Sequence, residues 1–291
     1  MNLIPCDLCG QNQFYHLFDK SSSRNEVFSI NECKNCGLVQ VNPQPDLEAV
    51  TPYYGAHYFE KRTDRGYDNY FSEEMKRNLF RVYEMNLSDA GFFEFEKSLA
   101  DSKGMCLDVG CAAGYFVEYM KERRWDAAGI EISESAASYG IEKLGLNIHI
   151  GDFFSDKNIK ENSYDFITLW ASIEHMHSPG KVMRRVNQLL KPGGRFILTT
   201  CRWGILSRMR GLNWRYMNVP EHLYFFTMKN MKTYAKKSGF NVHKSFTYGS
   251  GFTAKKDSGF LYRAAKKLFD PLVKITNQGD MMVFHMEKRS K

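Results

Sequence analysis

Two short apolar runs flank a stretch with helical spacing in the middle of the chain. Met105–Val109 is a compact, mostly apolar run, which is typical of a strand buried on both faces. Tyr115–Arg124 repeats apolar side chains at the spacing of one helix face, and Ala127–Ile130 is a second apolar run. The pattern predicts a strand–helix–strand unit of a doubly wound α/β sheet.

The same alternation continues to the end of the chain. Helices are predicted over Ser135–Leu144, Val182–Leu190 and Met228–Ser238, and strands over Ile148–Ile150, Tyr164–Trp170, Arg195–Thr200, Gly239–Tyr248 and Met281–Glu287. Thr227 is the expected N-cap of the third helix. Glu73–Leu99 has the spacing of one or two helices ahead of the sheet. We therefore expect a seven-stranded, Rossmann-like α/β sheet with an antiparallel edge formed by the last two strands.

A turn of small residues, Gly110–Gly114, joins the first predicted strand to its helix. Small side chains let the backbone approach a ligand closely, and ligands bind such sheets beyond the carboxyl ends of the strands. Glu131 ends the second strand, where its carboxylate can accept hydrogen bonds from two ribose hydroxyls. A dinucleotide fingerprint needs glycine where Ala112 and Tyr115 stand, so the turn favours S-adenosylmethionine, which has no pyrophosphate.

Three segments carry a family resemblance. Residues 107–114 read LDVGCAAG, which resembles the first motif of class I S-adenosylmethionine-dependent methyltransferases, commonly LDVGCGxG, with Ala112 in place of a glycine. Residues 171–179 resemble the family's xxEHxxDP segment, and residues 189–200, LLKPGGRFILTT, are similar to its late motif. The resemblance implies an Asp that accepts from the adenine amino group, at Asp152, and a residue on the adenine ring, at Phe153. The expected cofactor site is Asp108, Gly110, Ala112, Gly114, Tyr115, Phe116, Glu131, Ile132, Asp152, Phe153 and Trp170.

Two cysteine pairs near the beginning of the sequence predict a metal site. Cys6 and Cys9 form one pair and Cys33 and Cys36 the other, and a glycine follows each pair. Thiolates at this spacing complete a closed tetrahedral Cys₄ zinc site, which has no open position and is therefore structural. The segment between the pairs is long enough for a hairpin. A redox dithiol is the rival interpretation, but its usual βαβ context is missing.

These features divide the chain into a zinc ribbon at 1–45, an aromatic linker with helices at 46–100, and a cofactor-binding domain at 101–291. The linker is rich in aromatic residues, namely Tyr53, Tyr54, His57, Tyr58, Phe59, Tyr67, Tyr70 and Phe71. Two interpretations stay open. The linker is either an apolar seam between the ribbon and the main domain, or a lid over the cofactor that brings a tyrosine near the reacting group.

Composition and charge narrow the class of protein. The 291 residues are 43% hydrophobic and 25% charged, as in ordinary globular proteins. No apolar run approaches the roughly 18 residues of a membrane span, and residues 1–9 lack a secretory pattern, so we expect a cytoplasmic protein with reduced cysteines. The net charge of +7 favours an anionic partner. The ribbon itself has few basic residues, which argues against a nucleic-acid partner.

The segment after the fifth predicted strand should overhang the site on the acceptor side. It carries Arg202, Arg208, Arg210 and Arg215, which can bind phosphate. A ribbon ahead of the cofactor domain, with Glu221 and His222 in an EHxYxFT segment, resembles bacterial sugar methyltransferases that have an N-terminal zinc domain. In ketosugar C-methyltransferases of this kind such a Glu-His pair, with a histidine matching His175, serves proton abstraction. Those enzymes carry a further C-terminal domain, so we expect O-methylation of a nucleotide-linked or surface-polysaccharide sugar.

Several alternatives remain at this stage. His222 is expected to be the base, because imidazole titrates near neutral pH, while His175 is either a base or a structural hydrogen-bonding residue. The amphipathic stretch 260–273 is either an edge helix or a helix on a membrane surface. A methyltransferase that modifies RNA, or a non-catalytic module that binds the cofactor or nucleic acid, is the alternative function.

Overall fold

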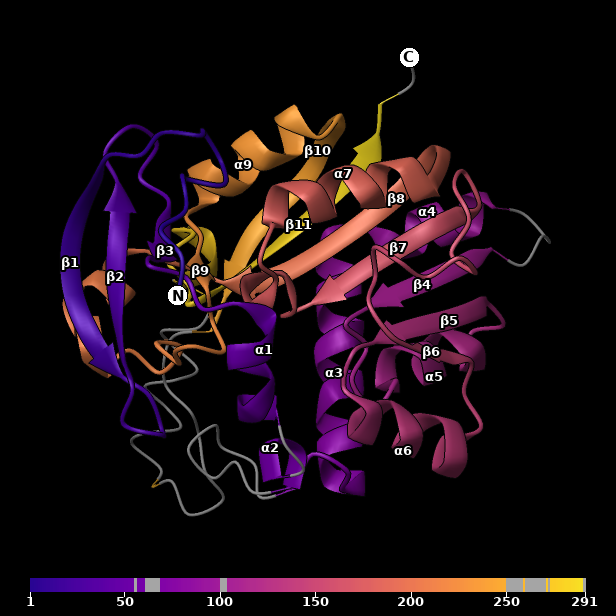
Figure 1. Ribbon diagram of the computed structural model, residues 1–291. Coiled ribbons are helices and arrows are strands. Elements are labelled where there is room, and N and C mark those ends of the chain that lie inside the picture. The colour runs from indigo at the N-terminus through magenta and orange to yellow at the C-terminus, as the bar shows by residue number, and fades with distance from the viewer. Residues whose placement is uncertain are drawn as a thin grey trace.

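A seven-stranded sheet forms the centre of the protein (Figure 1). The structure, a computed structural model, describes residues 1–54, 57–60, 69–99, 104–249, 259, 271 and 273–289. The strands are β4 (Met105–Val109), β5 (Asp126–Glu131), β6 (Ile148–Ile150), β7 (Tyr164–Trp170), β8 (Leu190–Cys201), β10 (Phe240–Tyr248) and β11 (Met281–Lys288). Their order is β10-β11-β8-β7-β4-β5-β6, with β4 to β8 parallel and β11 antiparallel to both of its neighbours. The predicted α/β architecture with an antiparallel edge is confirmed.

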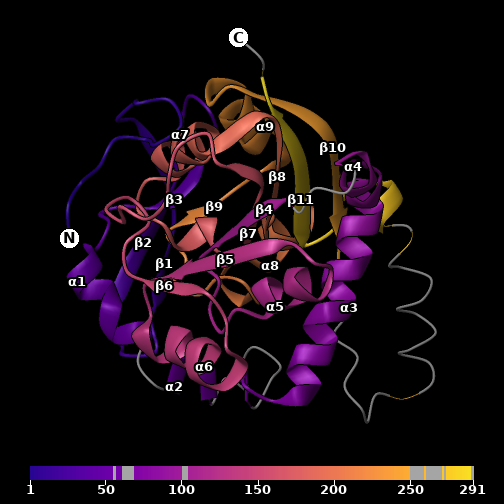
Figure 2. The ribbon, with the colours of Figure 1, turned by 90° about the vertical axis from the view of Figure 1, so that its right-hand side faces the viewer.

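Helices cover both faces of this sheet, as Figures 1 and 2 show from two directions. α3 (Glu73–Ala90), α5 (Tyr115–Glu122) and α6 (Glu134–Leu144) lie on one face, and α7 (Pro179–Leu189) and α9 (Met228–Lys237) lie on the other. The short α4 (Phe92–Ser98) follows α3 after a left-handed glycine, Gly91. The Thr227 side chain accepts a hydrogen bond from the Asn230 amide, so the predicted N-cap of α9 is confirmed.

Most element boundaries lie within three residues of the prediction, and the start of β8 differs more. β8 begins at Leu190, directly after α7, and not at Arg195. Tyr164 of β7 pairs with Leu190 and Phe166 pairs with Arg195, so the ladder contains a bulge that includes the two glycines. Gly193 has a φ of +75°, which suits a bulge. The glycines therefore interrupt the strand locally and do not delay its start.

The N-terminal segment forms a second sheet together with a short strand that lies much later in the sequence. β1 (Phe14–Ser21) and β2 (Val27–Cys33) form the expected antiparallel hairpin, and β3 (Val39–Val41) follows. The fourth strand, β9 (Tyr224–Phe225), pairs with β3, so the sheet order is β1-β2-β3-β9. In Figure 1 the arrows of β4, β7 and β8 point toward this second sheet. It therefore lies on the side of the large sheet where these strands have their carboxyl ends.

Polar contacts join the ribbon to the helices α7 and α9. The Asp7 carboxylate accepts hydrogen bonds from the Gly180 amide and the Tyr234 hydroxyl, each at 2.8 Å. The Asn230 side-chain amide donates at 2.9 Å to the backbone carbonyl of Cys36, one of the four cysteines of the predicted metal site. Buried residues from the ribbon and from the large sheet belong to one continuous apolar core. The ribbon is therefore packed into the protein on two sides.

The connector after the ribbon contains α1 (Leu47–Val50), η1 (Thr51–Tyr54) and α2 (His57–Glu60). The Tyr53 hydroxyl bonds to Ser22 at 2.9 Å and to Glu26 at 2.6 Å, so this tyrosine belongs to a seam with the ribbon. Tyr67, and the predicted helix over 260–273 apart from 271 and 273, lie outside the described residues. Within the described ranges, no helix combines the length and apolarity needed to span a bilayer.

Candidate active site

The turn between β4 and α5 is held against β5 and faces Glu131. The amides of Gly110 and Cys111 donate to the Ile130 carbonyl at 2.9 and 3.2 Å. The two carboxylate oxygens of Glu131 accept hydrogen bonds from the amides of Ala112 and Ser133, at 2.9 and 2.8 Å. Burial raises the pKa of the Glu131 carboxyl, while these amide donors oppose the rise. The turn and the acidic residue are thus parts of one preassembled structure.

Two glycines of the turn are required by space as well as by backbone geometry. Gly114 has a φ of +76°, and a Cβ there would lie 2.6 Å from the Ile148 side chain. Gly110 has a φ of +71°, and its Cβ would lie 2.8 Å from the Ser172 side chain. Ala112 also adopts a positive φ, +50°, where an L-residue is tolerated at a modest energetic cost. Ala112, which stands where the family motif usually has glycine, thus keeps the left-handed backbone conformation of the turn.

Asp108, near the end of β4, is almost completely buried beneath the turn. Its carboxylate accepts a hydrogen bond from the Thr168 hydroxyl at 2.7 Å. Burial, together with the nearby Glu131 charge, raises the pKa of Asp108 to about 7, while the hydrogen bond from Thr168 opposes the rise. A carboxyl group in this state is poised to pair with a cationic group, because such a group would favour its ionised form.

The residues expected near an adenine lie at the ends of β5 and β6. Ile132 directly follows Glu131 and is 53% exposed, so its apolar surface is available to a ring. Asp152 is exposed and accepts a hydrogen bond from the Ser155 amide at 3.1 Å, while Phe153 is buried. The structure therefore brings Glu131, Ile132 and Asp152 to one edge of the sheet, since β5 and β6 are adjacent and parallel.

The remaining predicted cofactor residues belong to an aromatic cluster beside the turn. Tyr115 is buried, and its hydroxyl donates to the Tyr70 carbonyl at 3.2 Å. Phe116 is fully buried, with its ring centroid 5.1 Å from that of Trp170. The Trp170 indole N–H is buried and finds no acceptor among the described residues. A buried donor of this kind is normally satisfied by water or by a ligand.

The three predicted catalytic residues come together on the other side of the site. His175 lies in η3 (Ile173–His175) after β7, and His222 precedes β9. Their ring centroids are 4.6 Å apart with the planes perpendicular. Glu221 contributes its backbone carbonyl oxygen, which lies 2.8 Å from His175 Nδ1. If this contact is an N–H···O bond, the proton is on Nδ1 and the lone pair is on Nε2.

The aromatic linker reaches this cluster through one residue. The Tyr54 hydroxyl lies 2.9 Å from His175 Nδ1 and donates to the Glu221 carbonyl at 3.2 Å. Its neighbour Tyr53 contacts the ribbon. Tyr53 thus contacts the ribbon, as the seam interpretation expects, and Tyr54 lies at the histidines. That the linker acts as a lid over the cofactor stays a prediction.

Sequence analysis missed Glu174 as a site residue. Its side chain is 1% exposed, and its carboxylate accepts a hydrogen bond from the Thr200 hydroxyl at 2.8 Å. Ligand atoms of Glu174, His175 and His222 lie within 4.8 Å of one another. Such a set can exchange protons or hold a divalent cation. The available signal was the Glu-His pair at 174–175, which matches the pair at 221–222.

The arginines expected on the acceptor side make contacts within the protein. Arg208 forms a bidentate pair with Glu32 of the ribbon, at 3.1 and 3.2 Å. Arg202 bonds to the Gln278 side chain, and burial lowers the pKa of its guanidinium. Arg208, Arg210 and Arg215 are all exposed. The segment therefore keeps three arginines at its surface, of which Arg208 is paired with Glu32.

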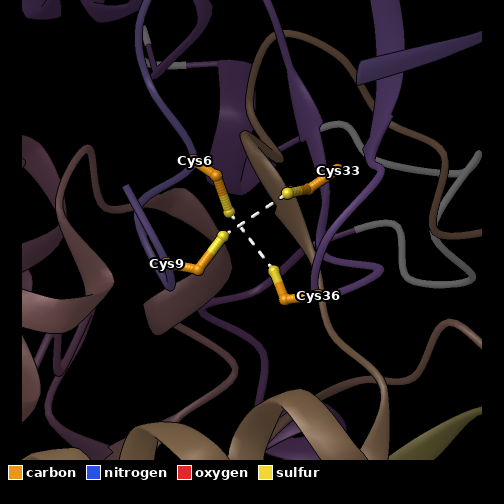
Figure 3. A group of neighbouring side chains, drawn as sticks. All are labelled: Cys6, Cys9, Cys33 and Cys36. Carbon is orange, nitrogen blue, oxygen red and sulfur yellow. Dashed lines mark hydrogen bonds between the residues drawn. The ribbon is translucent and has the colours of Figure 1, made fainter. Parts of the chain in front are cut away.

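The four cysteines converge on one point (Figure 3). The Sγ atoms of Cys6 and Cys36 are 3.4 Å apart, those of Cys9 and Cys33 are 3.5 Å apart, and all four lie within 4.8 Å of one another. A hydrogen bond from the Cys6 thiol lowers the pKa of Cys36 to about 5. Four soft sulfur donors at this spacing fit a tetrahedral zinc ion.

Comparisons with known proteins agree with this fold. A methyltransferase from Archaeoglobus fulgidus, described as S-adenosylmethionine-dependent, superposes with a TM-score of 0.55 at 15% identity, covering 80% of this chain and 100% of that one. Phosphoethanolamine N-methyltransferase 3 of Arabidopsis thaliana is 25% identical over 89% of this chain and 51% of its own length. Ubiquinone biosynthesis O-methyltransferase of Stutzerimonas stutzeri (strain A1501) is 28% identical over 41% of this chain and 53% of its own. The matches thus cover about half the length of these curated relatives.

The strand order, the glycine turn and the acidic residue after the second parallel strand define a class I methyltransferase fold. Residues 75–245, more than half of the chain, match the family described as a methyltransferase domain. The chain belongs to this family.

The buried Asp108 predicts a pH-dependent stability. Its pKa is raised from 3.8 to about 7, so the folded state holds a proton that the unfolded state releases between these values. The free energy of unfolding should therefore fall as pH rises through this window, by up to roughly 4 kcal/mol. Asp108→Asn keeps an acceptor for Thr168 and removes the effect. The difference in the free energy of unfolding between this variant and the parent protein should therefore shift in favour of the variant from pH 4 to pH 8. The midpoints of urea unfolding curves measure it.

Asp126→Asn, an exposed position at the start of β5, serves as the control and should shift the midpoint little at either pH. A stability difference between Asp108→Asn and the parent protein that is the same at both pH values would contradict the assignment of a raised pKa.

Proposed function

We propose that this protein is a methyltransferase that uses S-adenosylmethionine. The observation that carries the proposal is the preassembled glycine turn facing Glu131 at the carboxyl edge of the sheet, in a chain of the methyltransferase domain family. Glu131 would accept hydrogen bonds from the ribose hydroxyls, since its carboxylate has lone pairs beyond those used by the two amides. The buried Asp108 would pair with the ammonium group of the cofactor, because a nearby cation favours the ionised form of the Asp108 carboxyl group.

The adenine would lie at the edge formed by Ile132, Asp152 and Phe153. Ile132 offers an exposed apolar side chain, and Asp152 offers an exposed carboxylate as the acceptor for the amino group. The indole N–H of Trp170, which finds no acceptor among the described residues, supplies a donor within the aromatic cluster beside the turn. Together with Gly110, Ala112, Gly114, Tyr115 and Phe116, these residues make up the proposed cofactor site.

The transfer itself would occur between the cofactor and the histidine cluster. An acceptor oxygen attacks the methyl carbon in line, the carbon–sulfur bond breaks, and the electron pair stays on sulfur. Alignment supplies much of the rate, and a base that takes the hydroxyl proton adds roughly 10²–10⁴-fold. We propose His222, with His175 beside it, as the group that receives this proton, and Glu174 and Glu221 as the residues that hold the two rings.

The proposed acceptor is a small or glycan molecule with negative charge, most simply a nucleotide-linked or surface-polysaccharide sugar methylated on oxygen. Support comes from Arg210 and Arg215, which are exposed on the acceptor side. The names of both curated relatives refer to small molecules, one to N-methylation and one to O-methylation, and neither name refers to nucleic acid. A methyltransferase acting on RNA stays the alternative, and salt-dependent retention on tRNA would favour it.

The Cys₄ cluster is proposed to hold a structural zinc ion. Four cysteine ligands leave no open position for substrate. The ion would fix the two cysteine turns to each other and so stabilise the ribbon that contacts α7 and α9. On this basis the ribbon at 1–45 is a structural module, and the residues from 101 onward contain the cofactor site.

Cofactor affinity tests the first part of the proposal. Glu131→Gln preserves size but removes charge and one acceptor, so it should weaken S-adenosylmethionine binding by about 10–100-fold. Glu134→Gln, an exposed glutamate in the first turn of α6, should bind as the parent protein does. Calorimetry measures both. Unchanged affinity of Glu131→Gln, or tighter binding of NAD than of S-adenosylmethionine by the parent protein, would refute the cofactor assignment.

Turnover tests the histidine cluster. His222→Asn should keep cofactor affinity but lower kcat by roughly 10²–10⁴-fold, because it removes the proton acceptor and no cofactor contact. The assay is methyl transfer to a panel of nucleotide sugars, followed by mass spectrometry. Near-normal turnover of His222→Asn across a pH series would return His222 to a structural role.

Metal content of the same samples separates proton transfer from cation binding at this cluster. A metal bound in addition to that of the cysteines, and lost in His222→Asn, would identify Glu174, His175 and His222 as a cation site in place of a base.

Zinc content tests the ribbon. The parent protein should retain one zinc per chain after dialysis, and Cys36→Ser should lower both the zinc content and the melting temperature. Asn35→Ala changes the exposed neighbour in the same turn and should change neither. A parent protein without zinc, together with an unchanged melting temperature of Cys36→Ser, would mean that the cluster is not a zinc site.

A further inference from the structure

An exposed apolar stripe lies on α8 (Ile205–Arg210) and on η4 (Gly211–Asn213), which follows it. Ile205 is 57% exposed, Met209 79% and Leu212 41%. Ile205 and Met209 are spaced i, i+4 and so lie on one face of α8, while Leu212 follows the turn at Gly211, whose φ of +49° and ψ of −121° end the helix. We call these three exposed side chains the stripe. Several exposed apolar side chains within one short segment are more informative than singly scattered ones, because such a group marks a surface that meets another apolar phase.

The stripe is held outward by the packing beneath it. Ser207 is buried, and its hydroxyl bonds both the amide and the carbonyl of Gly204. Trp203 and Trp214 are buried with their rings 5.7 Å apart. The segment is therefore anchored by its buried residues, and the three apolar side chains of the stripe are the ones left exposed.

The stripe lies among positive charges. Residues 201–220 contain four arginines and no acidic residue. Arg210 and Arg215 are exposed. Two acidic residues reach this segment from elsewhere: Glu32 of the ribbon is paired with Arg208, and the buried Asp280 accepts a hydrogen bond from the Trp214 indole and attracts the nearby arginines. The Lys20 ammonium group donates to the Leu212 carbonyl at 3.0 Å, which adds a cation beside the stripe. Apolar side chains surrounded by cations complement a phase that is apolar inside and anionic at its surface.

The stripe follows closely in sequence after β8, one of the strands that contribute to the candidate site. α8 begins four residues after Cys201, the last residue of β8. Thr200, on the same strand, bonds the carboxylate of Glu174. A surface that docks on α8 would thus lie next to the segment that leads into the histidine cluster.

We propose that the face formed by Ile205, Met209 and Leu212, with Arg210 and Arg215, docks on the surface of an anionic lipid bilayer. Two side chains on the short α8 and one on η4 suit shallow insertion at the level of the headgroups. The arginines would contact lipid phosphates, and a bilayer fits both features, whereas RNA would leave the apolar side chains without a partner. The proposal does not depend on methyl transfer, because it concerns binding to the bilayer alone.

Vesicle binding of the full chain tests the proposal. The parent protein should co-sediment with vesicles of phosphatidylcholine and phosphatidylglycerol, and should bind phosphatidylcholine alone much more weakly. Binding to the mixed vesicles should fall as salt rises, since ions screen the attraction. Met209→Glu should lower the partition coefficient about tenfold. Arg210→Gln should lower it about fivefold, the value for one cation near an anionic surface.

Two matched variants control for general effects of charge. Met85→Glu changes a methionine on α3 that is 44% exposed, and Lys232→Gln changes an exposed cation on α9. Both should bind vesicles as the parent protein does. Calorimetric S-adenosylmethionine affinity should be the same in all four variants and the parent, which shows that each is folded.

Three outcomes would overturn the proposal. They are failure of the parent protein to bind the mixed vesicles, equal loss of binding in Met85→Glu and Met209→Glu, and retained binding in both Met209→Glu and Arg210→Gln. The last would move the contact to another surface. Salt-dependent binding of the parent protein to RNA that Arg210→Gln weakens, without vesicle binding, would identify a nucleic-acid surface instead.

Discussion

The pairing of β3 with β9 is the contact on which the arrangement of the site depends. β9 begins two residues after His222, and the Val41 amide of β3 donates to the carbonyl of the intervening Leu223 at 2.9 Å. The Leu223 amide in turn donates to the Glu174 carbonyl at 2.8 Å. One residue therefore links the ribbon sheet, the loop that carries His222 and the segment after β7. Without the ribbon, this loop would lose a strand partner, and unpaired backbone groups in the interior are costly.

The other half of the site is built within the parallel sheet and carries a different constraint. Asp108 and Glu131 are both buried, and burial raises the pKa of each. Holding acidic groups in the interior lowers stability unless donors or a cation compensate. Amides and the Thr168 hydroxyl supply part of that compensation here. A cationic ligand at Asp108 would supply more, so binding and stability are coupled at this residue.

The sequence predicted most of the sheet because its signals are local. The apolar run at 105–109, the glycine turn and Glu131 all act within a few residues of each other, and their periodicity follows from burial. The pairing of β3 with β9 has no such signal, since a two-residue strand has no period and its partner lies more than 180 residues away. Glu174 was missed for the same reason, because its burial is set by residues brought together only by the fold. Likewise, no spacing rule predicts that Arg208 pairs with Glu32, which lies 176 residues away in the sequence.

These two halves differ in how they are held, and the difference has a mechanistic consequence. The cofactor side rests on strand ladders and turns that are close in sequence, so it forms with the sheet itself. The histidine side rests on contacts between segments far apart, through β9, Tyr54 and the ribbon. Loosening the ribbon should therefore disturb the acceptor side before the cofactor side. On the proposed assignment of the site, the cofactor would bind in the half held by local contacts, and changes to the ribbon and linker could alter the acceptor side while leaving the glycine turn in place.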